Sequence, residues 1–92
     1  MKLDSKLLQK FKEALSDESL RFTNQRLFVL EDILASSEHR DCDQIYQSLC
    51  EDNRKVSKAT IYRTLEVLLN HGFIRKLDIG DGPVRYEKKI GN

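Results

Sequence analysis

Residues 57–89 read SKATIYRTLEVLLNHGFIRKLDIGDGPVRYEKK, and the fold can be inferred from a change of periodicity within this stretch. In its first half, the apolar residues recur at the spacing of one helix face. These are Ile61, Leu65, Leu68 and Leu69. Ser57 is a suitable N-cap, and Gly72 stands where a left-handed C-cap is favoured. The pattern predicts a helix over about residues 58–71.

After Gly72 the period changes from 3.6 to 2, which is typical of half-buried strands. Residues 73–79 alternate in this way, and so do residues 84–89. Between them lies Gly80-Asp81-Gly82-Pro83, a strong turn signal. The sequence therefore predicts a β-hairpin, with residues 73–90 as a wing beside the helix.

Three more amphipathic helices are predicted upstream. The first covers about residues 4–15, the second runs from an N-cap at Thr23 to about residue 36, and Asp41 caps the third. A polar break separates the second and third helices over residues 36–40. The order predicts one domain over residues 1–92, mainly α with a small β-hairpin. This is the winged helix-turn-helix layout, in which the helix at 58–71 is the recognition helix.

The outward face of the recognition helix carries the candidate chemistry. Its members are Ala59, Tyr62, Arg63, Glu66 and Asn70. An Arg can hold guanine O6 and N7 with two hydrogen bonds, and a Tyr ring can pack on a thymine methyl group. The alternative is structural: Tyr62 packs on a neighbouring helix and Arg63 pairs with Glu66 on a solvated surface.

The residues around this helix also favour nucleic acid. Four positive charges and no negative one lie between Arg54 and Arg63, and residues 56–92 carry 7 positive and 4 negative charges, net +3. The hydroxyls of Ser57, Thr60 and Thr64 and the helix N-terminus could meet phosphates. Earlier in the chain, Arg26 could contact a phosphate and Arg21 could enter a minor groove. Alternatively, these two are surface charges around a helix start.

Composition excludes several classes of protein. Lys and Arg number 16 against 15 Asp and Glu, so no polybasic tail is present, and no apolar run is long enough to cross a membrane. No catalytic triad, phosphate loop or zinc-finger spacing occurs, so an enzyme is not expected. Cys42 and Cys50 are expected to be reduced thiols in a cytoplasmic protein. The remaining alternative is a winged-helix module for protein contact, with Tyr62 as its anchor.

Several motifs together resemble the ferric uptake regulator family. They are Arg21-Phe22-Thr23-Asn24-Gln25-Arg26, Val29-Leu30, His39 ahead of Ile45-Tyr46, Ser57-Lys58-Ala59-Thr60-Ile61-Tyr62-Arg63-Thr64-Leu65, Gly72-Phe73-Ile74 and Arg85-Tyr86-Glu87. The resemblance implies a metal-responsive bacterial repressor that binds A/T-rich inverted repeats in double-stranded DNA as a dimer. It implies an N-terminal winged helix, which this chain matches, and a C-terminal dimerisation and metal domain, which we expect to be absent here.

The resemblance also implies roles for single residues. Tyr62 and Arg63 match major-groove contacts, and Arg21 takes the place of a basic minor-groove residue. His39 and Glu87 match two ligands of a regulatory metal site between the domains. With the other ligands outside this chain, we expect no cofactor here, and Fe²⁺, Mn²⁺ or Zn²⁺ in the full-length protein. Glu87 favours iron, and zinc, manganese and peroxide sensing stay open. Cys42 could complete a weak zinc site with His39. A homodimer is expected only with the C-terminal domain.

Overall fold

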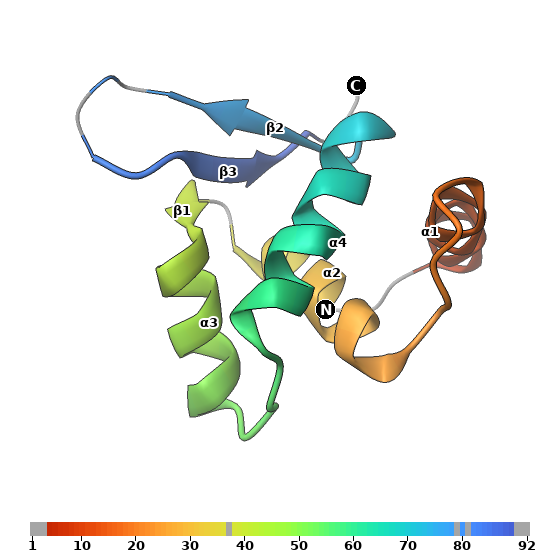
Figure 1. The fold of residues 1–92 in the computed structure, drawn as a ribbon, viewed down its shortest axis with the longest axis horizontal. Helices are drawn as coiled ribbons and strands as arrows, with labels where there is room; N and C mark the ends of the chain where they lie inside the picture. Colours follow the sequence, from red (N-terminus) through yellow and green to blue (C-terminus); the bar gives the residue numbers. More distant parts are fainter. Residues whose placement is uncertain (1–3, 37, 79, 81, 90–92) are drawn as a thin grey trace.

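The computed structural model describes residues 4–36, 38–78, 80 and 82–89. Within these residues the chain forms four helices and three short strands (Figure 1). In chain order they are α1 (Ser5–Asp17), α2 (Asn24–Ala35), β1 (Arg40–Asp41), α3 (Cys42–Glu51), α4 (Lys58–Asn70), β2 (Ile74–Leu77) and β3 (Arg85–Lys88). The winged helix-turn-helix prediction is confirmed. Of the predicted hairpin, Ile79, Asp81 and Ile90 lie outside the described residues.

Capping residues fix where the helices begin. The side chains of Asp4, Thr23, Asp41 and Ser57 each accept a hydrogen bond from the backbone N–H three residues later. For Thr23, Asp41 and Ser57 this confirms the predicted N-caps. At the end of α4, Gly72 adopts a φ of +80°, and the Phe73 N–H donates to the Leu68 carbonyl at 2.9 Å. This pair of features turns the chain from helix into strand.

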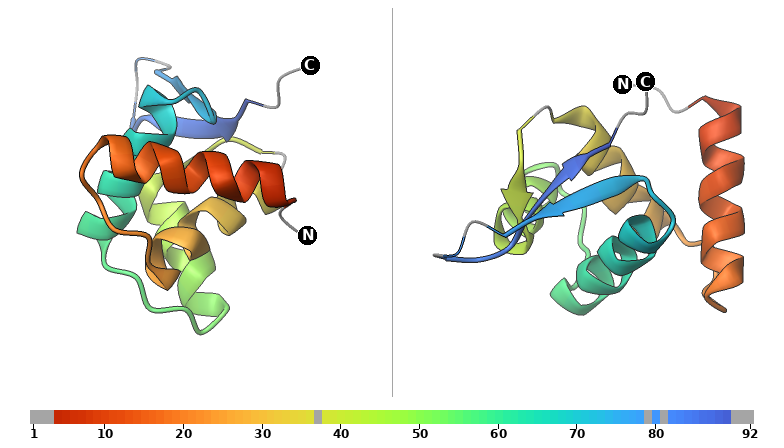
Figure 2. Two further views of the ribbon diagram at one scale, coloured as in Figure 1. Left: turned by 90° about the vertical axis from the view of Figure 1, so that its right-hand side faces the viewer. Right: turned by 90° about the horizontal axis from the view of Figure 1, so that it is seen from above.

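The helices pack in a row, with α3 at one end, α2 and α4 in the middle and α1 at the other end (Figures 1 and 2). One apolar core joins them, and its fully buried aliphatic side chains include Leu30, Ile45, Leu49, Ile61 and Leu65. Val29 and Val67 are also fully buried. The apolar stripe read from the sequence for residues 58–71 omitted Val67, because α4 is covered on more than one side.

The sheet contains a strand that the sequence did not predict. Strand β1 pairs antiparallel with β3, which pairs antiparallel with β2, giving the order β1-β3-β2. Residues 36–40 were predicted to be a polar break, and this is wrong for Arg40, which lies opposite Tyr86. Two residues are too few to show a period of 2, so only the partner strand reveals them.

A buried ion pair holds β1 against the helices. The Arg40 guanidinium donates to Asp32 Oδ2 at 2.7 Å and to the Asp32 carbonyl at 2.8 Å, and the Ser48 hydroxyl donates to Asp32 Oδ1 at 2.6 Å. Only 7% of the Asp32 side chain is exposed. On β3, the Lys88 ammonium donates to the Leu34 carbonyl at 3.2 Å. The base of the wing is therefore fastened to α2 by two side chains.

Cys42 and Cys50 both lie in described residues and are free thiols. Cys42 is buried and Cys50 is exposed. Burial, followed by the negative charge of Asp43, raises the pKa of the Cys42 thiol. Among the helices of the described residues, none is both long and apolar enough to cross a membrane.

Candidate nucleic-acid interface

Helix α4 turns one side outward beside the wing. Tyr62 is 54% exposed, and the side chains of Arg63 and Glu66 are 51% and 63% exposed. The opposite side of the same helix, at Ile61 and Leu65, is completely buried. The outward direction predicted for Tyr62 and Arg63 is thus what the structure shows, and both side chains are accessible to a partner.

The start of α4 is open and polar. The Ser57 hydroxyl accepts from the Thr60 N–H at 3.1 Å and donates to Thr60 Oγ1 at 3.0 Å. Ala59 is exposed and adds no bulk beside the first-turn amides. Lys58 lies 3.0 Å from Asp43, and this carboxylate raises the pKa of the Lys58 ammonium. Helix starts of this kind suit an anion, because their first N–H groups point outward.

Among the basic and hydroxyl residues predicted to flank this surface, Thr64 and Arg54 are engaged elsewhere. Thr64 was expected to offer a hydroxyl to phosphate, and this is wrong: it is completely buried and donates to the Thr60 carbonyl at 2.7 Å. Arg54 pairs with Glu31 at 2.9 Å and covers the Phe28 ring at 4.4 Å. Helical spacing could have separated Thr64 from the outer face, because Thr64 lies three residues after Ile61 and four before Leu68, on their side of the helix.

A groove of about 430 Å³ runs between α4 and the sheet. Its lining residues are Glu18, Tyr62, Arg63, Glu66, Leu69, Asn70, Lys76 and Tyr86. Burial raises the pKa of the Tyr86 phenol, and the neighbouring Tyr62, Cys42 and Glu66 groups add to this effect. The groove brings a wing lysine to the same surface as the Tyr62–Arg63 pair.

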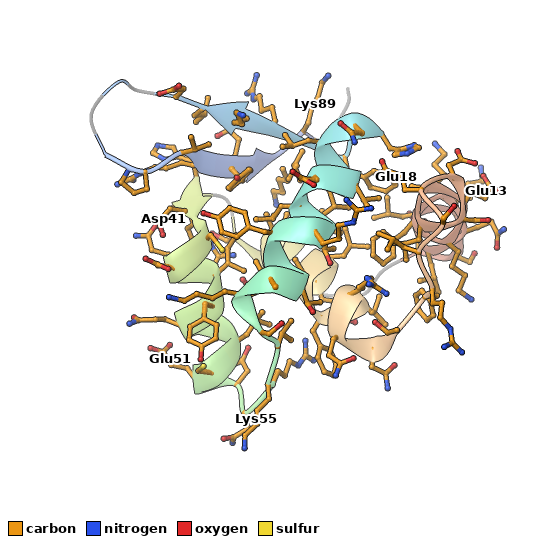
Figure 3. All side chains as sticks on the ribbon, in the orientation of Figure 1. Glu13, Glu18, Asp41, Glu51, Lys55 and Lys89 are labelled. Atoms are coloured by element: carbon orange, nitrogen blue, oxygen red, sulfur yellow. The ribbon has the colours of Figure 1, made fainter. Side chains whose placement is uncertain are left out.

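Glu18, the C-cap of α1, is a lining residue of this groove and lies between α1 and the end of α4 (Figure 3). Its carboxylate accepts from Asn70 Nδ2 at 3.0 Å and lies 3.3 Å from His71 Nε2. No local sequence pattern predicts this contact, because Glu18 and Asn70 are 52 residues apart in the chain. The contact ties the α1–α2 connection to the end of α4.

Arg21 and Arg26 lie in that connection and at the start of α2. Arg21 is exposed, and its carbonyl accepts from Arg26 Nη1 at 2.8 Å. Arg21 follows Glu18 by three residues, so its backbone lies within about 10 Å of the groove. Arg26 is half-buried and turned back on the chain, which makes it a support for the Arg21 segment.

The structural alternative describes Arg63 correctly but does not describe Tyr62. Arg63 Nη1 does lie 3.6 Å from Glu66 Oε1, as that alternative expects. Tyr62, however, leaves more than half of its surface in solvent instead of packing on a neighbouring helix. An exposed ion pair of this kind stabilises a fold by about 0–1 kcal/mol, so both groups are available to a ligand.

The strand that was not predicted begins directly after His39 and pairs with the strand that contains Glu87. Arg40 lies opposite Tyr86, and continuing this antiparallel register by one residue places His39 opposite Glu87. Glu87 is bound by Arg75 across the β2–β3 pair. His39 Nδ1 is buried and has no hydrogen-bond partner. Among the described residues, however, no three His, Cys, Asp or Glu side chains are grouped as a metal site requires, so Cys42 does not complete one with His39.

Comparison with known proteins agrees with this architecture. The model of the ferric uptake regulator family matches residues 17–92. The chain belongs to this family. A curated member, the peroxide-responsive repressor PerR of Staphylococcus saprophyticus, is 36% identical over 79 residues, which cover 86% of this chain and 53% of that repressor.

Solved structures of other family members show the same fold. The ferric uptake regulator Fur of Helicobacter pylori matches with a TM-score of 0.78 and 25% identity, over 96% of this chain and 61% of that one. PerR of Streptococcus pyogenes matches with a TM-score of 0.71 and 30% identity, over 94% and 58%. The chain spans about half the length of the curated relative described above.

Proposed function

We propose that this chain is the sequence-specific DNA-binding half of a metal-responsive transcriptional repressor. The observation that carries the proposal is the exposed Tyr62–Arg63 pair on α4, beside a groove that a wing lysine also lines. In the winged helix-turn-helix layout, the second helix of the motif enters the major groove. An Arg and a Tyr on its outward side can then reach base edges.

Each residue of the surface has a proposed contact. Arg63 donates to guanine O6 and N7, while the Tyr62 ring packs on a thymine methyl group. One phosphate is bound at the start of α4 by backbone amides, by hydroxyl groups and by an ammonium group. The residues that supply these groups are Ser57, Lys58, Ala59 and Thr60. To reach that phosphate, the Lys58 ammonium must leave its ion pair with Asp43. This costs little free energy because both side chains are exposed.

Arg21 is proposed to enter the minor groove next to the major-groove site. Arg26 holds the Arg21 carbonyl and so fixes the path of this segment. A narrow minor groove in an A/T-rich site has a stronger negative potential, which attracts an Arg side chain. The family resemblance supports A/T-rich inverted repeats as the operators.

The Arg21→Ala variant should therefore lose more affinity for a duplex with an A-tract beside the half-site than for the same duplex with G·C pairs there. Fluorescence anisotropy titrations at one salt concentration measure both losses. Arg26→Ala is the companion variant. It removes the hydrogen bond to the Arg21 carbonyl and keeps the Arg21 side chain itself. Equal losses of affinity on the two duplexes would show that Arg21 contacts only phosphate.

The metal response is proposed to involve His39 and Glu87. An imidazole nitrogen and a carboxylate oxygen are suitable ligands for Fe²⁺, Mn²⁺ or Zn²⁺, and His39 has a buried ring nitrogen without a partner. The described residues supply these two ligands and no third. We propose that the remaining ligands, like the dimer interface, belong to the half of the relatives' length that this chain does not match. A bound metal would then fix the orientation of two domains.

Salt dependence tests the DNA-binding proposal against the alternative of a protein-contact module. The 92-residue chain should bind duplex DNA with log K falling by about 0.9 per decade of salt for each phosphate contacted. The duplexes are one selected by the chain from a randomised pool and a scrambled version of it. Affinity that is absent, or indifferent to salt and to sequence, would contradict the proposal and favour a protein partner for Tyr62.

A further inference from the structure

Helix α4 carries one acidic residue, Glu66, and it lies on the outward side. Its carboxylate is 3.6 Å from Arg63 Nη1 and lines the groove shared with Tyr62 and Lys76. A negative charge in the middle of a surface that meets phosphates is unfavourable for binding. The exposed pair with Arg63 contributes at most about 1 kcal/mol to folding, so stability does not account for this position.

A carboxylate can only accept hydrogen bonds, and this limits what it can meet in the major groove. Phosphate oxygens, guanine O6 and N7 and thymine O4 are all acceptors and repel it. The donors are the amino groups of cytosine and adenine, and in adenine the acceptor N7 lies beside the amino group, so cytosine suits a carboxylate better. Glu66 lies three residues beyond Arg63, which is about 4.5 Å along the helix axis. Base pairs are stacked about 3.4 Å apart, so the two side chains can read neighbouring pairs.

We infer that Glu66 determines specificity: it accepts a hydrogen bond from cytosine next to the guanine held by Arg63, and it repels phosphate in every other register. The inference rests on the proposed DNA-binding function. Before DNA binds, Glu66 is paired with Arg63. This pair competes with non-specific contacts between Arg63 and phosphates. Discrimination between sites is a difference of affinities, and a repulsive group raises it by weakening the wrong complexes.

The test is the Glu66→Gln variant, which removes the charge and keeps the size. On the scrambled duplex, its affinity should rise about fivefold, the size expected for one or two screened charge contacts at about 7–8 Å. On the selected duplex the gain should be smaller, because the hydrogen bond from cytosine weakens. The ratio of the two affinities should therefore fall.

Glu13→Gln is the matched control, since Glu13 is exposed on α1 and its side chain lies outside the groove. It should leave the ratio of affinities unchanged. An equal gain on both duplexes, or no gain on either, would overturn the inference while leaving the DNA-binding proposal standing. Failure of the wild-type chain to bind any duplex would instead overturn both. A thermal melt of each variant confirms that all of them are folded.

Discussion

The Asp32→Ala variant is expected to lose about 3–5 kcal/mol of unfolding free energy, because it leaves the Arg40 guanidinium buried without its counter-charge. Only 16% of the Arg40 side chain is exposed, so water cannot replace the lost carboxylate. The Ser48 hydroxyl also loses its acceptor. Since small domains are stable by about 5–15 kcal/mol, the change would bring this chain close to unfolding.

Urea denaturation followed by circular dichroism measures this loss. Glu31→Ala is the matched control, because Glu31 precedes Asp32 on α2 and its pair with Arg54 is about one-third exposed. That variant should lose no more than about 1 kcal/mol. If the two variants were equally stable, the Asp32–Arg40 pair would not be what holds β1 to the helices.

The Arg63→Ala variant is expected to lose about 1–3 kcal/mol of binding free energy on the selected duplex, roughly five- to 150-fold in affinity. The loss should be much smaller on the scrambled duplex, because a phosphate contact is worth less than a bidentate contact to guanine. Arg63 is half exposed and belongs to no core contact, so the fold should be unaffected. Anisotropy titrations on both duplexes at fixed salt give the two values.

Lys10→Ala serves as the charge control for Arg63→Ala. It also removes one positive charge from an exposed helix position, but on α1 instead of α4. It should weaken binding slightly and equally on both duplexes, as long-range electrostatics predicts. An affinity for the selected duplex within twofold of wild type in Arg63→Ala would show that Arg63 does not read a base.

Local signals in the sequence were sufficient for the helices, their caps and the outward direction of Tyr62 and Arg63. Each depends on residues fewer than about five positions apart, where periodicity and capping chemistry act directly. Strand β1 could not be predicted, because a two-residue strand is defined only by a partner 46 residues away, as in the pairing of Arg40 with Tyr86. For the same reason the sequence alone could not show that the residue after His39 pairs with the strand that contains Glu87.

The burial of polar residues is the second feature that was not predicted from the sequence. Thr64 and Asp32 both carry groups typical of surfaces, and both are buried because a nearby partner satisfies them. For Thr64 that partner is a carbonyl of its own helix, and for Asp32 it is an Arg from another element. The first contact is local and follows from helical spacing, whereas the second depends on how separate elements assemble, on which composition and spacing contain no information.

The fastening of the wing to α2 has a consequence for how the molecule opens. Because Arg40 and Lys88 tie β1 and β3 to α2, separating the base of the hairpin from that helix breaks both of these contacts. Amide hydrogens at the base should then exchange with solvent only in the same cooperative event that exposes the core. We therefore expect the wing base and the helices to form one unfolding unit, in which the surface offered by α4 and the sheet keeps its shape until the whole domain unfolds.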